Sequence, residues 1–209
     1  MRVLIIDDHA IVRRGLISLL QECFGQVEIG EAADAKAGLT AAILDPWDLA
    51  LLDISMPGRN GLELIAEIKR EKPELPILVM STHEEKDYAL RALKSGASGY
   101  VSKQSAPDVL VTAVKRVLGG GRYVSQAFAE HLAGAVAGNT SLKSHDTLSN
   151  RELLVLKLIA SGRSIKEISA DLALSAKTVA TYRSRIVDKM HLSSNVDLTR
   201  YALQNGLVE

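Results

Sequence analysis

Carboxylates stand at the ends of two apolar segments in the first third of the sequence. Asp7 and Asp8 follow residues 3–6, and Asp53 follows residues 49–52. If both segments are strands of one parallel sheet, their carboxyl ends meet at the edge where α/β domains bind ligands. Acids that merely face solvent from loops explain any one of these residues but explain all three poorly. Since neighbouring carboxylates repel one another, we expect a hard cation with oxygen ligands there, namely Mg²⁺.

Two further polar side chains end neighbouring apolar segments. Ser81 ends the segment 77–81, and Lys103 lies just beyond residues 99–102. The Lys103 ammonium could neutralise the acidic cluster or hold a phosphoryl oxygen, and the Ser81 hydroxyl could reach the same region. The sequence thus predicts a site of acids, one hydroxyl and one cation at one edge of a sheet.

A second feature that could carry a function is a basic helix predicted over residues 176–190. Val179, Ile186 and Met190 recur on one face of it, which turns the polar residues to the other side. Such a helix can lie in the major groove of DNA, although a plain solvated basic face is the alternative. The residues expected to contact DNA phosphates, on this helix and before it, are Lys166, Lys177, Thr178, Tyr182, Arg185 and Lys189.

The elements that would position the first site alternate between short apolar runs and stretches of helical period. This alternation is typical of βα units and a parallel sheet, so we expect an α/β domain with helices on both faces of the sheet. The expected strands are residues 2–7, 26–32, 49–53, 77–81 and 99–102, and the expected helices are residues 10–22, 34–44, 61–72, 85–95 and 106–118.

The elements beyond residue 147 are all predicted to be helices. Ser149 with Glu152, and Ser164 with Glu167, have the spacing of capping boxes that open two of them. Short helices joined by a tight turn and followed by a basic helix are typical of a helix-turn-helix. The expected helices are residues 150–161, 165–172, 176–190 and 195–204, with a turn at 173–175.

Residues 119–146 separate the two regions. They begin with three glycines and are rich in alanine, glycine and serine, with one weak helical segment at 126–136. This composition predicts a linker. The expected domains are therefore residues 1–118 and 147–209.

Composition and charge limit the function. Hydrophobic residues make up 47% of the chain and charged residues 24%, which is ordinary for a globular protein. Residues 1–118 hold 14 basic and 17 acidic side chains, whereas residues 147–209 hold 9 and 6, so the C-terminal region is better suited to a polyanion. Because no long uncharged apolar run occurs, we expect a cytoplasmic protein without a membrane partner.

Residues 1–118 contain four motifs: Ile5-Ile6-Asp7-Asp8, Asp53-Ile54-Ser55-Met56-Pro57 with Gly61, Ser81, and Gly99-Tyr100-Val101-Ser102-Lys103. As a set they resemble the receiver domain of response regulators. The resemblance implies a flavodoxin-like fold, in which a five-stranded, doubly wound parallel sheet has the strand order 2-1-3-4-5.

The resemblance also implies roles for individual residues. Asp53 would accept a phosphoryl group from a histidine of a sensor kinase. Asp8, Asp53 and the backbone carbonyl of Ser55 would bind Mg²⁺, with Asp7 helping directly or through water. In response to the phosphate, Ser81 would hydrogen-bond it, Tyr100 would turn inward, and Lys103 would pair with it.

Residues 147–209 contain Leu148-Ser149-Asn150-Arg151-Glu152, Ile165-Lys166-Glu167-Ile168 and Ser175-Ala176-Lys177-Thr178-Val179. These resemble the LuxR-type helix-turn-helix of NarL/FixJ regulators, which implies a small all-α domain of four helices that binds double-stranded DNA. By this resemblance, Ala180, Thr181 and Ser184 contact base edges. Some relatives carry lysine where this chain has Ala180, which could touch a thymine methyl group but cannot recognise guanine.

Together the two resemblances predict a two-component response regulator. Phosphorylation of Asp53 would control sequence-specific DNA binding and transcription, with no enzymatic activity beyond the protein's own phosphotransfer and autodephosphorylation. A Mg²⁺-dependent phosphohydrolase that uses an aspartyl-phosphate is the alternative. The sequence offers neither the substrate lid nor the added catalytic groups that such an enzyme needs. A third interpretation, an interaction module without a DNA role, conflicts with the basic helix.

The expected partners are double-stranded DNA, a sensor histidine kinase, a second copy of the chain after phosphorylation, and RNA polymerase. Dimerisation is expected through the last helical region, which carries Val196, Leu198, Leu203 and Leu207. The histidines at 9, 83, 131, 145 and 191 show no metal-ligand spacing and are expected on the surface or in loops.

Overall fold

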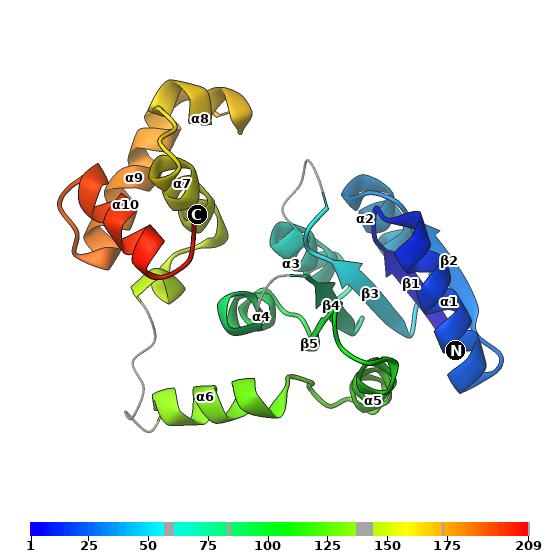
Figure 1. The fold of residues 1–209 in the computed structure, drawn as a ribbon. Coiled ribbons are helices and arrows are strands. Elements are labelled where there is room, and N and C mark those ends of the chain that lie inside the picture. The colour runs from blue at the N-terminus through cyan, green and yellow to red at the C-terminus, as the bar shows by residue number, and fades with distance from the viewer. Residues whose placement is uncertain (57–60, 83–84, 137–143, 173, 209) are drawn as a thin grey trace. The chain divides into compact units, whose positions relative to one another are not determined.

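The computed structural model of the chain divides into two units, Met1–Thr140 and Ser141–Glu209. It describes every residue except 57–60, 83–84, 137–143, 173 and 209 (Figure 1). Three predicted features therefore lie partly outside the described residues: Pro57 of the Asp53 motif, the middle of the linker, and the first residue of the turn at 173–175. Among the residues described, no helix combines the length and the apolar character needed to cross a membrane.

Five parallel strands form the sheet of the first unit, in the order β2-β1-β3-β4-β5 (Figure 1). The predicted fold class and strand order are confirmed. Strands β3 and β4 are buried along their whole length, as expected for central strands of a parallel sheet that is covered on both faces. The bounds are β1 (Arg2–Ile6), β2 (Glu28–Ala32), β3 (Leu49–Asp53), β4 (Ile77–Ser81) and β5 (Gly99–Ser102).

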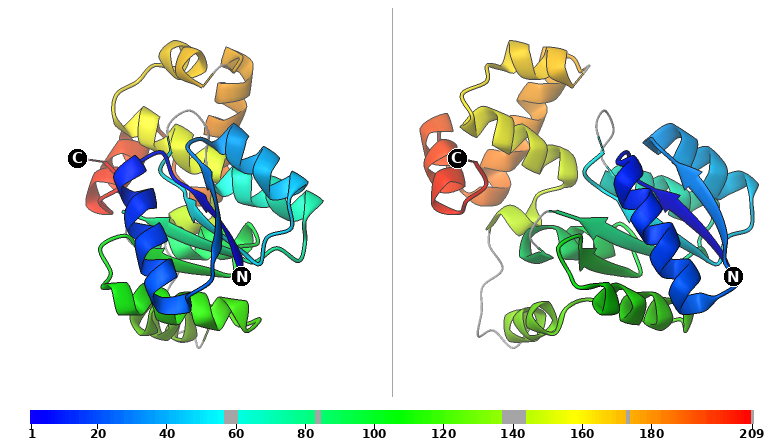
Figure 2. Two further views of the ribbon diagram at one scale, coloured as in Figure 1. Left: turned by 90° about the vertical axis from the view of Figure 1, so that its right-hand side faces the viewer. Right: turned by 45° about the vertical axis from the view of Figure 1, so that its right-hand side comes forward.

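Helices cover both faces of this sheet (Figure 2). Successive strand residues point to opposite faces, so Val3 and Ile5 pack in one hydrophobic cluster and Leu4 and Ile6 in the other. Two helices, α1 (Ala10–Phe24) and α5 (Pro107–Leu118), contribute to the first cluster. Three helices, α2 (Ala35–Leu44), α3 (Gly61–Glu71) and α4 (Glu85–Lys94), contribute to the second.

The strand register brings the predicted polar residues to one edge of the sheet. Ile6 pairs with Leu52, so Asp7 and Asp53 are the next residues of neighbouring strands. Ser81 pairs with Ser102, and the Lys103 amide then donates to the Ser81 carbonyl at 2.8 Å. The carboxyl ends of β1, β3, β4 and β5 thus converge, as the sequence predicts.

Much of the segment predicted as a linker packs on the first unit. Tyr123 forms a bridge with Gly99, and the Tyr100 amide donates to the Tyr123 carbonyl at 2.9 Å, which covers the outer edge of β5. Gly99 is required there, because a Cβ atom on it would lie 2.6 Å from the Tyr123 oxygen. Helix α6 (Gln126–Val136) follows and buries Phe128 in the core of the first unit.

The second unit is helical. Both predicted capping boxes form: Ser149 with Glu152 opens α7, and Ser164 with Glu167 opens α8. Val179, Ile186 and Met190 of α9 lie in the core of this unit, as the apolar stripe predicts. The described elements are a short 3-10 turn (Ser144–Thr147) and the helices α7 (Asn150–Ala160), α8 (Ile165–Asp171), α9 (Ala176–Met190) and α10 (Asn195–Gln204).

Candidate functional site

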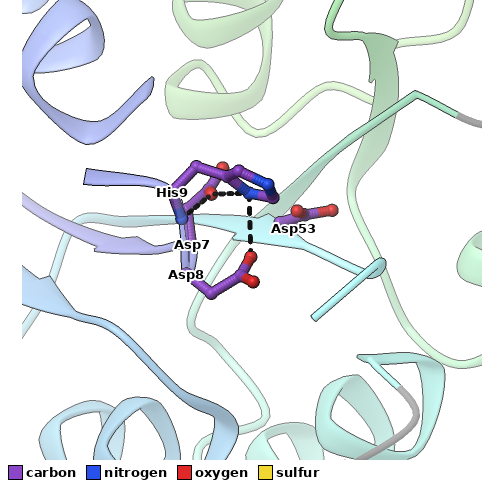
Figure 3. Close-up of side chains that lie close together, drawn as sticks. All are labelled: Asp7, Asp8, His9 and Asp53. Atoms are coloured by element: carbon purple, nitrogen blue, oxygen red, sulfur yellow. Dashed lines mark hydrogen bonds and ion pairs between the residues drawn. The ribbon is translucent and has the colours of Figure 1, made fainter. Parts of the chain in front are cut away.

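The acidic residues predicted from the sequence lie together beyond the ends of β1 and β3 (Figure 3). Asp7 and Asp53 are each only 1% exposed, and Asp8 is partly exposed beside them. One donor atom from each of these carboxylates and from His9 lies within 4.8 Å of the others. The four side chains form a cluster that can hold a metal ion.

Lys103 neutralises part of this negative charge. Its Nζ lies 2.6 Å from Asp7 Oδ2 and 2.6 Å from Asp53 Oδ2. Burial lowers the pKa of Lys103, but its hydrogen bond to Asp53 and its ion pair with Asp7 outweigh this effect and raise the pKa. The ammonium is therefore fixed as a cation between two buried carboxylates.

The donor set fits a hard divalent cation. Asp7 Oδ2 and Asp8 Oδ1 are buried and accept no hydrogen bond of good geometry from any residue that the structure describes; each has only an ion-pair contact. Buried carboxylate oxygens that lack hydrogen bonds are costly unless a cation approaches them. Asp53 Oδ1 accepts a hydrogen bond from the Ser55 amide at 2.8 Å, which holds Ser55 beside Asp53.

Ser81 and Tyr100 form a buried polar pair next to this cluster. Ser81 is fully buried, and its Oγ lies 3.2 Å from Ser55 Oγ. The Tyr100 ring is also fully buried and its hydroxyl is hydrogen-bonded to Ser81. Burial raises the pKa of Tyr100, so the hydroxyl stays protonated. The chain of contacts from Asp53 through Ser55 and Ser81 reaches Tyr100.

His9 is a site residue that the sequence interpretation missed. Its Nδ1 lies 2.9 Å from Asp8 Oδ1 and 3.3 Å from Asp7 Oδ1 (Figure 3). No spacing pattern among the five histidines pointed to it. The signal was simpler: His9 directly follows the two acids that come after β1.

In the second unit, most of the predicted DNA contacts are available on the surface. Thr178 and Tyr182 are half-buried, and Tyr182 packs partly against the core. The exposed members of the predicted set are Lys166, Lys177, Ala180, Thr181, Ser184, Arg185 and Lys189.

Lys189 differs from the other cations because it is engaged inside the unit. Its Nζ lies 2.7 Å from Glu152 Oε2, and the same oxygen accepts from the Ser149 amide at 2.6 Å. The Glu152 side chain is almost completely buried, so this pair ties the end of α9 to the start of α7.

The apolar residues expected to support dimerisation divide into two groups. Leu198 and Leu207 are buried in the core of the second unit. Val196 and Leu203 are 65% and 52% exposed. Only the second group is therefore available to a partner.

Two family models match the chain. One, for the response regulator receiver domain, matches residues 3–115, and the other, for bacterial regulatory proteins of the luxR family, matches residues 146–202. The alternative of a phosphohydrolase is not favoured by these matches.

Curated relatives match over nearly the whole chain. The response regulator UvrY of Escherichia coli K12 is 34% identical over 98% of this chain and 94% of its own length. The response regulator GacA of Pseudomonas protegens is 35% identical over 100% of this chain and 98% of its own. Among solved structures, one match is RcsB of Salmonella enterica serovar Typhimurium, bound to the promoter rprA in the presence of the phosphomimetic BeF₃⁻. Its TM-score is 0.70 at 29% identity, and the match covers 96% of this chain and 97% of the RcsB chain.

These matches join the receiver fold and the helical unit in one family. The chain belongs to the NarL/FixJ-type response regulators, in which a receiver domain is followed by a LuxR-type helix-turn-helix.

Proposed function

We propose that Asp53 is the phosphoacceptor through which a sensor histidine kinase controls transcription by this regulator. An Asp53 carboxylate oxygen would attack the phosphorus of the kinase phosphohistidine; the P–N bond breaks, and its electron pair and a proton stay with the imidazole. The observation that carries this proposal is the buried Asp53 carboxylate at the end of β3, held 2.6 Å from the Lys103 ammonium.

Mg²⁺ is the cation that we propose for the acidic cluster. Asp8, Asp53 and the Ser55 backbone carbonyl would hold it, with Asp7 contributing directly or through water. A bound Mg²⁺ shields the negative charges of the carboxylate and the phosphoryl group from one another. Lys103 would exchange an aspartate oxygen for a phosphoryl oxygen and so stabilise the phosphorylated state.

The signal would leave the site through Ser81 and Tyr100. A phosphoryl group adds about −1.5 to −2 charges and three acceptor oxygens. The Ser81 hydroxyl, now beside Ser55, would turn to one of those oxygens, and the buried Tyr100 hydroxyl bonded to Ser81 would follow it. The β4–α4 and β5 regions are therefore the proposed moving face of the receiver.

The output would be DNA binding through α9. Lys166, Lys177, Arg185, Thr178 and Tyr182 would contact phosphates. The base edges would be contacted by Ala180, Thr181 and Ser184. Lys189 would take a smaller share of the phosphate contacts, because its ammonium is bonded to Glu152.

We also propose that the phosphorylated protein dimerises and contacts RNA polymerase in the cytoplasm. Val196 and Leu203 are the exposed apolar residues of α10 that support a dimer contact. A two-fold dimer would bind paired DNA half-sites. Autodephosphorylation, in which water attacks the aspartyl-phosphate, would end the signal without a separate substrate.

The test is phosphorylation by a small acyl phosphate with Mg²⁺, followed by intact-mass measurement and DNA binding. The protein should gain one phosphoryl group, and the Asp53→Asn variant should gain none. Phosphorylation should raise both the dimer fraction and the DNA affinity of the wild type. Unchanged DNA affinity and molecular mass after full Asp53 phosphorylation would overturn the proposal, and sustained turnover of added phosphate esters would favour the phosphohydrolase.

A further inference from the structure

His9 contributes a nitrogen donor to a cluster that otherwise offers only oxygen. The residue follows β1 and is the N-cap of α1, which it precedes directly. Its side chain makes no capping bond to any residue in the described part of the chain. Instead Nδ1 faces the two carboxylates of Asp7 and Asp8 (Figure 3). The helix cap therefore does not explain the position of this ring.

The separations of the donor atoms suit a common ion. In a tetrahedral Zn²⁺ site with metal–ligand bonds of about 2.0–2.1 Å, adjacent donors are about 3.3 Å apart. The Nδ1 atom of His9 lies 2.9 Å from Asp8 Oδ1 and 3.3 Å from Asp7 Oδ1. With Asp53 included, all four donor atoms lie within 4.8 Å of one another. Two aspartates and one histidine thus approach the spacing of neighbouring ligands.

A second observation points to a ligand between these groups. Asp7 is 1% exposed, and among the residues that the structure describes its Oδ2 makes an ion pair with the Lys103 ammonium at 2.6 Å and no hydrogen bond of good geometry. Asp7 Oδ1, by contrast, accepts from the His9 amide at 2.8 Å. This bond fixes the backbone of His9 against the site, while the ring is 61% exposed.

We propose that His9 is a metal ligand of this site and makes it a binding site for borderline divalent ions of the first transition series, represented by Zn²⁺. This inference rests on the cation site of the proposed function. Imidazole nitrogen is a good ligand for Zn²⁺, whereas Mg²⁺ prefers carboxylate, carbonyl and water oxygens. His9 would therefore strengthen the binding of Zn²⁺ and leave the binding of Mg²⁺ almost unchanged.

The consequence is a regulator whose phosphorylation site senses the metal that occupies it. Zn²⁺ held by Asp8, Asp53 and His9 would bind the phosphoacceptor carboxylate, as Mg²⁺ would, and would in addition hold His9 at the acidic cluster. Mg²⁺ leaves the exposed His9 ring free to turn aside. Transition ions would therefore compete with Mg²⁺ at the phosphoacceptor.

The experiment measures the affinities of the full-length protein for Zn²⁺ and Mg²⁺ by isothermal titration calorimetry. The variants are His9→Ala, His9→Asn and Asp53→Asn, with His191→Asn as the matched control. His191 is exposed and adopts a left-handed conformation at the end of α9, which asparagine tolerates. Because asparagine is also a favourable N-cap residue, His9→Asn keeps the start of α1 intact.

The expected result is selective. His9→Ala and His9→Asn should each weaken Zn²⁺ binding by about tenfold or more, since even partners outside the metal's first shell often contribute that much. The same variants should change Mg²⁺ affinity by less than about twofold, because Mg²⁺ prefers oxygen ligands. Asp53→Asn should weaken both ions, and His191→Asn neither. In ¹⁵N-labelled wild-type protein, Zn²⁺ should shift the Nδ1 resonance of His9 and excess Mg²⁺ should reverse that shift.

The outcomes separate this inference from the proposed function. If Mg²⁺ binds and Asp53→Asn weakens it, but neither His9 variant alters Zn²⁺ affinity, then the inference is wrong and the proposed function stands. An unshifted Nδ1 resonance in the presence of Zn²⁺ would also overturn it, leaving His9 as a charge partner of the aspartates. If the wild type binds no Mg²⁺, the proposed cation site itself fails.

Discussion

Lys103 has a structural as well as a functional role, because it lies between two buried carboxylates. Replacing it by methionine would leave Asp7 and Asp53 buried without their cation. Removing one partner of a buried ion pair costs about 3–5 kcal/mol, so we expect Lys103→Met to lower the free energy of unfolding of the first unit by about 3 kcal/mol. Urea unfolding measures the loss, and Mg²⁺ should restore part of it. Lys36→Met, at an exposed position of α2, should change stability by less than about 0.5 kcal/mol.

Alkaline pH should destabilise the first unit through two residues of the site. Folding raises the pKa of Lys103 above its ordinary 10.5 and that of Tyr100 above its ordinary 10.0. Above those ordinary values the folded protein holds more protons than the unfolded chain, so stability falls as pH rises. Below them neither residue contributes any pH dependence.

Tyr100→Phe tests this expectation. The variant lacks the buried hydroxyl, so its free energy of unfolding should fall less steeply between pH 9 and pH 11, a range around the ordinary pKa of tyrosine, about 10. Urea unfolding at several pH values measures both slopes. Identical slopes in the variant and the wild type would show that the Tyr100 hydroxyl ionises as freely in the folded protein as in the unfolded chain.

The sequence predicted most of the site but not the side chains that are defined only by contacts. Asp7, Asp8, Asp53, Ser81 and Lys103 could be predicted because each follows or ends an apolar strand, and parallel strands end at one edge. The burial of a side chain and its contacts with distant residues leave no such pattern in the sequence. The contact of His9 with the aspartates was therefore missed, and so was that of Lys189 with Glu152.

At the scale of elements, α9 is held to α7 by a charge pair in which the exposed Lys189 contacts the buried Glu152. Burial opposes the ionisation of Glu152, but hydrogen bonds from Lys189 and Ser149 outweigh that effect and lower its pKa. Stability from this carboxylate is therefore present above its ordinary pKa of 4.5 and is lost as pH falls through the lowered value. The pair sets the position of the basic helix and removes one cation from its DNA-facing set.

The salt dependence of DNA binding distinguishes these roles. Lys177→Ala and Arg185→Ala should each reduce the slope of log affinity against log salt concentration by about one, because each removes one phosphate contact. Lys189→Ala should reduce it by clearly less. Fluorescence anisotropy with a DNA duplex at several salt concentrations measures the slopes, and thermal unfolding identifies any variant that has lost its fold. An equal reduction of the slope for Lys189→Ala and Lys177→Ala would contradict the conclusion that Lys189 is engaged by Glu152.

Helix α6 stabilises the receiver although its sequence resembles a linker. Phe128 is buried in the core of the first unit, and Phe→Ala changes in cores cost about 3–5 kcal/mol. We expect Phe128→Ala to lower the free energy of unfolding of the first unit by about 3 kcal/mol, as measured by urea unfolding. The exposed neighbour Ala129→Ser is the control and should have little effect. Near-wild-type stability of Phe128→Ala would mean that α6 is not part of the core.

The elements were predicted well where pattern decides them and poorly where tertiary contacts do. The strands and helices of residues 1–118 have strong periodic signals, and both capping boxes mark their helices correctly. The segment 119–136 begins with three glycines and is rich in alanine and glycine. Its place in the first unit depends on the Tyr123 bridge to Gly99 and on Phe128, neither of which is a local signal.

At the scale of the whole molecule, the hydrophobic clusters of the two units have no residue in common within the described part of the chain. The clusters on the two faces of the sheet end with Phe128 and Val117, whereas the third cluster begins with Leu148. Because each core is buried within its own unit, we expect each unit to unfold cooperatively by itself. Differential scanning calorimetry of the full chain should then resolve two transitions. Phe128→Ala should lower the melting temperature of the first unit only, and Glu152→Ala that of the second unit only, which assigns the two transitions.

A ligand of the receiver should move only one of these transitions. Mg²⁺ together with BeF₃⁻, a mimic of the phosphoryl group, should bind the folded site at Asp53 and not the unfolded chain, so it should raise the melting temperature of the first unit; at 100 times the dissociation constant the gain is about 2.7 kcal/mol. Asp53→Asn should abolish this increase.

The second transition should stay in place unless the ligand also drives dimerisation through α10. In that case the melting temperature of the second unit rises with protein concentration. Lysine in place of Leu203 should then remove the concentration dependence and leave the ligand-induced rise of the first transition intact. Loss of both effects in that variant would contradict a dimer contact confined to the second unit.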